Sequence, residues 1–314
     1  MNNYYQVDQN GMKKITNENT ENKNLTIYRN STRNDRKMFI QKYQLPQDIF
    51  DFDEEFPVSP RIEMIENNTL IFVVSSIQNT SEKTDVEKRF ESHTFVLIDE
   101  KLFWFMEKYT AHLDEELYNE KKTTIYSLAE LILEFGLKVY KKFVQELDKQ
   151  KRTIDRLNAQ AVHTTDQEVL VELADTERNL VMLEHTLKIQ EKCFNDLLEY
   201  DHFTGKISND FLIRHLKWYI QQVNKLINIY RDLLDTTSSL FSDIMSSNLN
   251  KIMKFLSSLS LVFAAVSLVS SLWGMNTGGL PLDEEIYGTI IISGVAILAG
   301  FIMYLFLKKK DYFD

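Results

Sequence analysis

The chain has 314 residues, of which 26% are charged, and its formal net charge at pH 7 is -10, so by average composition it resembles an acidic soluble protein. A single cysteine, Cys193, excludes an intrachain disulfide bond and a zinc cluster built on several cysteines. The sequence contains no P-loop, dinucleotide-binding fingerprint or nucleophile motif. We therefore expect no enzyme, no cofactor and no nucleic-acid partner.

The N-terminal residues 1–24 are polar and rich in Asn. They lack the apolar run of a secretory signal peptide. We expect a disordered tail here, and we expect the N-terminal part of the chain to stay in the cytoplasm.

Residues 25–123 are expected to form a cytoplasmic α/β domain, which makes the overall class α+β. Three apolar runs have the length of strands, namely Leu70–Val74, Thr94–Ile98 and Leu102–Phe105. The last two are expected to form a hairpin across the polar residues Asp99–Lys101. Ile27 and Tyr28 indicate a further strand.

Residues 124–207 have the composition of long helices, because no proline occurs between Pro60 and Pro281. We predict one helix from Thr124 to about Ala161 and a second from Asp166 to about Tyr200, antiparallel to the first. A third helix is expected to begin at Ser208 or Asn209, either of which can act as N-cap.

The third helix carries apolar residues at alternating spacings of four and three, the pattern of a heptad repeat. These residues are Leu212, Leu216, Tyr219, Val223, Leu226, Tyr230, Leu233, Thr237, Leu240 and Ile244. The stripe indicates packing either on the chain's own domain or, as we favour, on copies of the same chain.

Two stretches near the C-terminus, Phe255–Asn276 and Ile286–Leu307, are each 22 residues long and free of Lys, Arg, Asp and Glu. A helix of roughly 20 apolar residues crosses a bilayer core of about 30 Å. Both stretches are therefore predicted to span a membrane, and the alternative is a buried helix of a soluble protein. The first continues the stalk helix, so residues 208–276 are expected to form one element.

Basic residues flank both spans on one side. Lys251 and Lys254 precede the first span, and Lys308–Lys310 follow the second. By the positive-inside rule, both chain termini, including the tail 308–314, face the cytoplasm of a multi-pass protein in the cell membrane. The loop 277–285 then lies outside.

The heptad stripe becomes small and polar as it enters the membrane. Its members there are Asn250, Met253, Ser257, Ser260, Ala264, Ser267 and Ser271. A row of hydroxyls in hydrocarbon is either a helix-packing surface or the lining of a water-filled path. Met253 and Leu256 can form an apolar constriction in such a path.

At the outer end of the first span, Gly274, Met275 and Asn276 form a Gly-Met-Asn triplet. With the two spans, the stalk helix and the lysine tail, this motif resembles the CorA family of Mg²⁺ transporters. The resemblance implies a homopentamer whose stalk helices continue as pore-lining spans, with the second spans as an outer ring. It also implies that Gly274, Met275 and Asn276 hold the hydrated ion, which is the transported ion and not a cofactor.

By the same resemblance the pore is lined by Asn250, Met253, Leu256, Ser267 and Ser271. Ser257, Ser260 and Ala264, which belong to the same stripe, complete the expected lining. The loop carboxylates Asp283, Glu284 and Glu285 would concentrate cations at the outer mouth. Otherwise they are solvated residues of a loop.

The sequence departs from the family in two places. The loop after the triplet, residues 277–281, is more similar to that of the zinc-transporting ZntB branch. His215 and Ser239 stand where the family has the stalk aspartates of its regulatory Mg²⁺ sites, so that sensor is expected to be altered or absent. The six histidines lack metal-ligand spacing and are expected to have surface or core roles.

These features predict a passive Mg²⁺ channel, with Co²⁺ or Ni²⁺ as further substrates, that contacts the lipid bilayer and copies of itself. A Zn²⁺ transporter of the same superfamily is the alternative. A membrane-anchored coiled-coil scaffold is the alternative from another functional class.

Overall fold

The computed structural model describes residues 2–15, 23–50, 59–65, 69–78, 86–106, 116–119, 124–161, 167–275 and 287–310. The chain divides into two compact units. The first comprises Met1–Gln160 and Asp166–Thr237, and the second comprises Ala161–Thr165 and Ser238–Asp314. Helix α6 (Asp210–Trp273) is 64 residues long and contributes to both.

The first unit contains a seven-stranded sheet in the order β2-β1-β3-β7-β6-β5-β4. The strands are β1 (Asn2–Asp8), β2 (Gly11–Ile15), β3 (Leu25–Arg29), β4 (Arg61–Ile65), β5 (Thr69–Ile77), β6 (Phe90–Ile98) and β7 (Lys101–Met106). Neighbours are antiparallel except β3 and β7, which run parallel. The three apolar runs fall within β5, β6 and β7, and Ile27 and Tyr28 lie in β3, so these predictions are confirmed.

The hairpin between β6 and β7 is tighter than expected. Ile98 pairs with Lys101, so the connection contains only Asp99 and Glu100. Asp99 has a φ of 52°, in the left-handed region that Asp tolerates better than most residues. Asp99 therefore allows a two-residue turn in place of the expected three-residue connection.

The expectation of a disordered tail over residues 1–24 is wrong for the described part, because β1 and β2 form a hairpin there. Tyr5, Val7 and Met12 bury their side chains, so the polar composition conceals an alternating apolar face. The turn signal was present in the sequence as Asn10-Gly11, with Gly11 at a φ of 100°.

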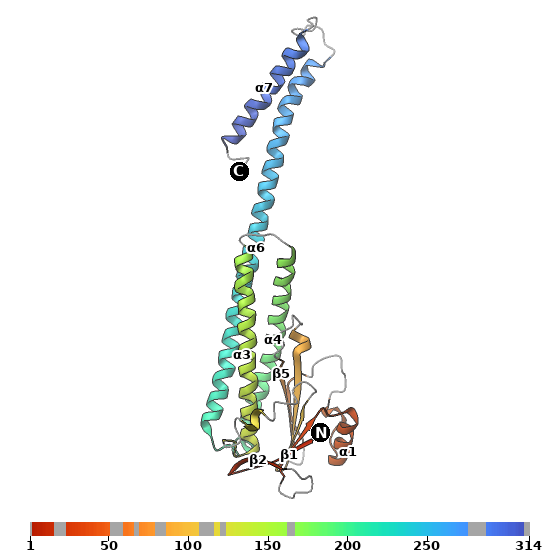
Figure 1. Ribbon diagram of the computed structural model, residues 1–314, viewed down its shortest axis with the longest axis vertical. Coiled ribbons are helices and arrows are strands. Elements are labelled where there is room, and N and C mark those ends of the chain that lie inside the picture. The colour runs from red at the N-terminus through yellow and green to blue at the C-terminus, as the bar shows by residue number, and fades with distance from the viewer. Residues whose placement is uncertain are drawn as a thin grey trace. The chain divides into compact units, whose positions relative to one another are not determined.

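Alternate residues of β5, β6 and β7 point to opposite sides of the sheet. Nearly all of them are buried, so both faces of the sheet are covered. On one side lies helix α1 (Arg33–Tyr43) (Figure 1). The ring centroid of its Phe39 lies 4.9 Å from that of Phe103 and 5.0 Å from that of Phe105. On the other side Trp104 lies 4.9 Å from the ring of Phe135. The sheet core is thus built from aromatic contacts in two layers.

The helical layer on the side of Phe135 consists of α3 (Leu128–Ala161), α4 (Gln167–Glu199) and the first part of α6. These three helices lie side by side in Figure 1 and agree with the predicted boundaries to within a few residues. Asn209 acts as the expected N-cap of α6, because its Oδ1 accepts a hydrogen bond from the Phe211 amide at 3.1 Å.

The stripe on α6 is buried mainly by the chain's own helices, which corrects the expectation that copies of the chain would cover it. A Cβ built on Gly136 of α3 would lie 3.5 Å from Leu216 Cδ1. Asn224 donates to Glu191 of α4 at 2.7 Å, and Arg231 donates to Glu184 of α4. The buried face is also wider than a heptad seam, since it includes Ile220, Ile227, Leu234 and Phe241. Two neighbouring helices need a broader apolar face than one coiled-coil partner does.

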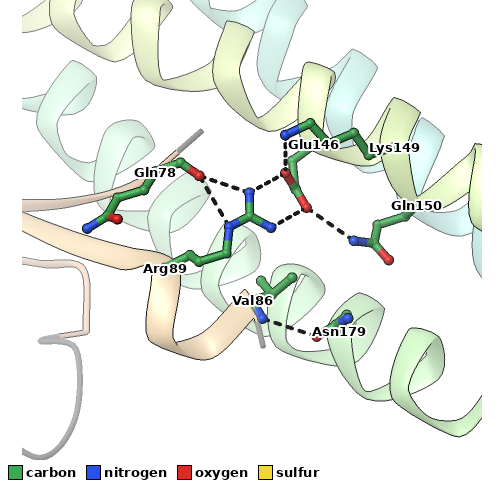
Figure 2. A network of polar contacts seen from close by, with 7 residues as sticks. All are labelled: Gln78, Val86, Arg89, Glu146, Lys149, Gln150 and Asn179. Atoms are coloured by element: carbon green, nitrogen blue, oxygen red, sulfur yellow. Dashed lines mark hydrogen bonds and ion pairs between the residues drawn. The ribbon is translucent and has the colours of Figure 1, made fainter. Parts of the chain in front are cut away.

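A buried polar network fastens the 3-10 helix η2 (Val86–Arg89) to α3 and α4 (Figure 2). The guanidinium of Arg89 donates to both carboxylate oxygens of Glu146 and to the carbonyl oxygen of Gln78. Gln150 donates to Glu146 at 3.1 Å, and the Val86 amide donates to Asn179 at 3.2 Å. The connection between β5 and β6 is therefore held to the helical layer at both ends of η2.

Candidate ion pathway

The second unit contains the end of α6 and helix α7 (Gly288–Lys308). Both helices are long and apolar enough to cross a membrane. Within their most apolar stretches only 6% of α6 and 17% of α7 are buried by the chain itself. A core helix of a soluble protein would be mostly buried, so this exposure favours the membrane interpretation.

Helix α7 packs on one face of α6, which includes Val262 and Val266. A Cβ atom built on Gly300 of α7 would lie 2.7 Å from Val266 Cγ2 and 3.8 Å from Val262 Cγ1. Ser258 lies on the same side of α6, is fully buried, and donates its hydroxyl to the Lys254 carbonyl at 2.7 Å. At ~100° per residue, the centre of the side formed by Ser258, Val262 and Val266 lies about 140° to 160° around the helix from Ser257, Ser260 and Ser267.

The residues predicted to line a path all lie on the face turned away from α7. Asn250, Met253, Leu256, Ser257, Ser260, Ala264, Ser267 and Ser271 are all exposed in the single chain. We call this set of residues the polar face of α6. The structure therefore brings the predicted lining together on one side and leaves it uncovered by the chain.

Hydroxyls of this region satisfy part of their hydrogen-bonding capacity within α6. Ser260 donates to the Leu256 carbonyl at 2.9 Å, and Ser270, outside the polar face, donates to the Val266 carbonyl at 3.1 Å. A serine bonded in this way keeps acceptor lone pairs on its oxygen. Such oxygens can accept from the water molecules of a hydrated cation, and they do not strip its hydration shell.

The first two residues of the Gly-Met-Asn triplet directly follow the C-terminal end of α6. The Gly274 amide donates to the Ser270 carbonyl at 3.0 Å, and a Cβ on Gly274 would approach that carbonyl to 3.3 Å. Met275 is exposed. Asn276 and the loop carboxylates Asp283, Glu284 and Glu285 lie outside the described residues, so their predicted roles remain predictions.

Basic residues border the apolar stretches of both helices on the side remote from the Gly-Met-Asn triplet. Lys251 and Lys254 on α6 are exposed, as are Lys308–Lys310 at the end of α7. Lys251 and Lys254 lie within α6 just before its apolar stretch, and Lys308–Lys310 lie where that of α7 ends, which fits the expected charge asymmetry.

The two expected departures from a regulatory pattern, His215 and Ser239, both lie on α6. His215 is half-buried between the rings of Phe211 and Tyr219, with centroids 5.3 and 5.1 Å away, and Ser239 is exposed. Within the described part of the chain, no group of three or more His, Cys, Asp or Glu side chains is placed to hold a metal ion. His93 has the core role expected of a histidine, since it is fully buried.

Sequence reasoning missed the packing surface of the second span. Ala296 and Gly300 are buried and lie one turn apart, whereas the expectation for the second span was only an outer ring around the path. The signal was available as two small residues separated by three positions, a pattern that lets membrane helices approach closely.

Comparison with known proteins places these features in a wider context. Residues 26–309 match the family model described as CorA-like Mg2+ transporter protein. The cobalt/magnesium transport protein CorA of Thermotoga maritima is 23% identical over 263 residues, which cover 81% of this chain and 72% of that protein.

Two solved structures share the fold. The CorA magnesium transporter of Methanocaldococcus jannaschii has a TM-score of 0.78 at 14% identity, covering 99% of this chain and 98% of that one. The ZntB cytoplasmic domain of Vibrio parahaemolyticus has a TM-score of 0.59 at 14% identity, covering 78% of this chain and 96% of that one.

Proposed function

Since this chain belongs to the CorA-like Mg²⁺ transporter family and is thus a divalent cation transporter of the membrane, we propose that it conducts hydrated Mg²⁺ passively into the cytoplasm. The path we propose runs along the polar face of α6, in an assembly of identical chains. Family membership favours transport over the membrane-anchored scaffold.

The observation that carries this proposal is the uncovered polar face. Ser257, Ser260 and Ser267 lie within a candidate membrane span, they are exposed in the single chain, and α7 occupies the opposite side. Polar groups at membrane depth face a protein partner or a water-filled cavity and avoid lipid. Several copies of α6 turned toward a common axis would meet that requirement.

A symmetric ring supplies the partners that one chain lacks, because identical chains related by a closed rotation present the same face to the axis. A homopentamer is the assembly we propose, on the resemblance to the family. In it each chain contributes one wall of the path, and the α7 helices stand behind the walls against lipid.

Mg²⁺ is the ion we propose because it loses its waters reluctantly and prefers oxygen ligands in octahedral geometry. Serine hydroxyls and the amides of Asn250 and Asn276 are neutral oxygen donors that can hold bound waters without trapping a double charge. The Thermotoga relative is named a cobalt/magnesium transport protein, which supports this choice and adds Co²⁺. Ni²⁺ is a further candidate. The membrane potential supplies roughly 4.6 kcal/mol for two charges per 100 mV.

The exposed lysines at the inner ends of both spans support an orientation with both termini in the cytoplasm of the cell. The Gly-Met-Asn triplet then lies at the outer mouth, where Asn276 would meet the incoming hydrated ion. Asp283, Glu284 and Glu285 would raise the local concentration of cations there.

Zn²⁺ transport is the second candidate. It rests on the loop 277–281 and on the shared fold of the ZntB cytoplasmic domain. Competition between Mg²⁺, Co²⁺, Ni²⁺ and Zn²⁺ in one flux assay discriminates the two candidates. In a Mg²⁺ channel, Mg²⁺ should inhibit entry of the other ions at lower concentrations than Zn²⁺ does, and in a Zn²⁺ transporter the order should be reversed.

The proposal is tested with the purified full chain in liposomes that contain a Mg²⁺-sensitive dye. The parent should admit Mg²⁺ above the rate of empty vesicles, Asn276→Ala should reduce that rate, and Ser260→Leu with Ser267→Leu should block it. Ser270→Leu is the matched control, because Ser270 lies on α6 outside the polar face. Entry no faster than in empty vesicles, or equal block by the control, would overturn the proposed path.

A further inference from the structure

Among Gly274, Gly294 and Gly300 of the second unit, Gly300 of α7 comes closest to a neighbouring side chain, that of Val266 on α6. A Cβ on Gly300 would lie only 2.7 Å from Val266 Cγ2, a separation that real side chains do not adopt. The same Cβ would lie 3.9 Å from the Val262 carbonyl oxygen. The methyl of Val266 thus occupies the space that any side chain at position 300 would need.

Gly294 shows that this is a property of one face of α7. It lies on the same helix and is exposed, and a Cβ built on it meets none of the described atoms within 4 Å. A side chain would therefore fit at position 294, whereas the contact with Val266 excludes one at position 300. Ala296, buried one turn before Gly300, extends the close-packed face.

The position of Val266 gives this contact a consequence for the ion path. At ~100° per residue, Val266 lies nearly opposite Ser257 and Ala264 on α6 and about 120° around the helix from Ser260. Because α6 is a rigid helix there, the seating of Val266 in the space above Gly300 determines which face of α6 is turned from α7. A side chain at position 300 must displace α7 or rotate α6, since interiors packed this closely do not absorb an extra methyl group.

We propose that Gly300 is a positioning residue for the ion path: it seats Val266 and so holds the polar face of α6 toward the path. The inference rests on the proposed function, because it assigns Gly300 a role in orienting the proposed lining. Gly300 itself touches no ion.

The test measures the orientation of α6 directly in the full chain, reconstituted in liposomes. In separate variants, a cysteine replaces Ser267, on the polar face, or Val269, which is half-buried on the opposite side of α6. The rate of reaction with a small charged thiol reagent reports whether each cysteine is accessible to water. In the parent, S267C should react on the order of tenfold faster than V269C, since a charged reagent is excluded from apolar surroundings. Gly300→Ala should reduce this ratio, and Mg²⁺ entry, by about fivefold. Gly294→Ala should change neither.

Rescue separates positioning from general damage. Val266→Ala removes the methyl group that clashes, so Gly300→Ala with Val266→Ala should restore the labelling ratio and Mg²⁺ entry to within about twofold of the parent. If Gly300→Ala yields no folded protein, recovery of folded, correctly labelled protein in the double variant supports the inference, and continued loss overturns it.

The outcomes distinguish the two proposals. If S267C is protected from the reagent in the parent, the polar face is not a water-filled path, and both the proposed function and this inference are wrong. If S267C reacts in the parent but the ratio and flux are the same in Gly300→Ala, the path stands and the positioning role of Gly300 is refuted.

Discussion

Arg89 and Glu146 form a buried ion pair in which both side chains are almost inaccessible, with relative exposures of 7% and 3%. Two hydrogen bonds of 2.8 and 2.6 Å join Nη1 to Oε1 and Nη2 to Oε2 (Figure 2). Burial by itself would raise the pKa of Glu146, but the bonds and charge of Arg89, aided by Lys149, hold the pKa below its ordinary value. The carboxylate is thus charged and paired inside the first unit.

Arg89→Met should strongly destabilise the first unit, because it leaves the Glu146 carboxylate buried without its partner. The expected loss is about 3–5 kcal/mol, and Arg89→Met with Glu146→Leu should recover much of it. Denaturant unfolding of the detergent-solubilised chain measures both. Arg178→Met is the control, since the ion pair of Arg178 with Glu87 is far more exposed and should be worth less than about 1 kcal/mol. Equal losses from the two single variants would contradict the prediction.

His93 should make the folded state less stable as the pH decreases. Complete burial, with Lys142 as a secondary influence, lowers its pKa to about 3, and Trp104 donates to its Nδ1 at 3.3 Å. An unfolded chain binds a proton on this residue near pH 6.5, whereas the folded chain does not. Stability is therefore complete above pH 6.5 and declines by up to about 1.4 kcal/mol per pH unit as the pH falls from 6.5 toward 3.

Unfolding of the solubilised chain between pH 7.5 and 4.5 checks this. His93→Gln should flatten the pH dependence, while His185→Gln, at an exposed position of α4, should leave the slope unchanged. A slope that is the same in both variants would mean that His93 does not cause it.

Gly136 should tolerate no side chain. A Cβ at this position of α3 would lie 2.7 and 2.8 Å from two ring atoms of Phe194 on α4. Gly136→Ala should cost about 1–3 kcal/mol in unfolding free energy through overpacking. Combined with Phe194→Leu, the loss should be smaller than the sum of the two single losses. Additive losses, measured by denaturant unfolding, would show that the two sites do not contact each other.

Cys193 should resist thiol reagents in the folded chain. Its side chain is buried, and burial raises its pKa to about 11, with the nearby Asp196 contributing. Since the thiolate is the reactive form, less than about 10% modification is expected at pH 7.5 under conditions that label an exposed cysteine fully. Mass spectrometry measures this, with the denatured chain as positive control. Fast modification of the folded chain would contradict the burial.

Much of the fold was predictable from local signals. The strands of β5, β6 and β7 lie in continuous apolar runs because they are covered on both faces, by α1 and by α3. The first hairpin escaped prediction although Asn10-Gly11 marked its turn, since only Tyr5, Val7 and Met12 carry its buried face. A composition average hides a pattern made by so few residues.

The sequence by itself determined the two apolar spans, the continuous stalk helix and the polar face of α6, because length, the absence of charge and helical periodicity are local properties. Only the tertiary structure decided what covers each face. It assigned the stripe of α6 up to Thr237 to the chain's own helices, and it assigned Val262 and Val266 to α7 through Gly300. A periodic pattern shows that a face must be covered, but the identity of its neighbour depends on which distant segments fold against it.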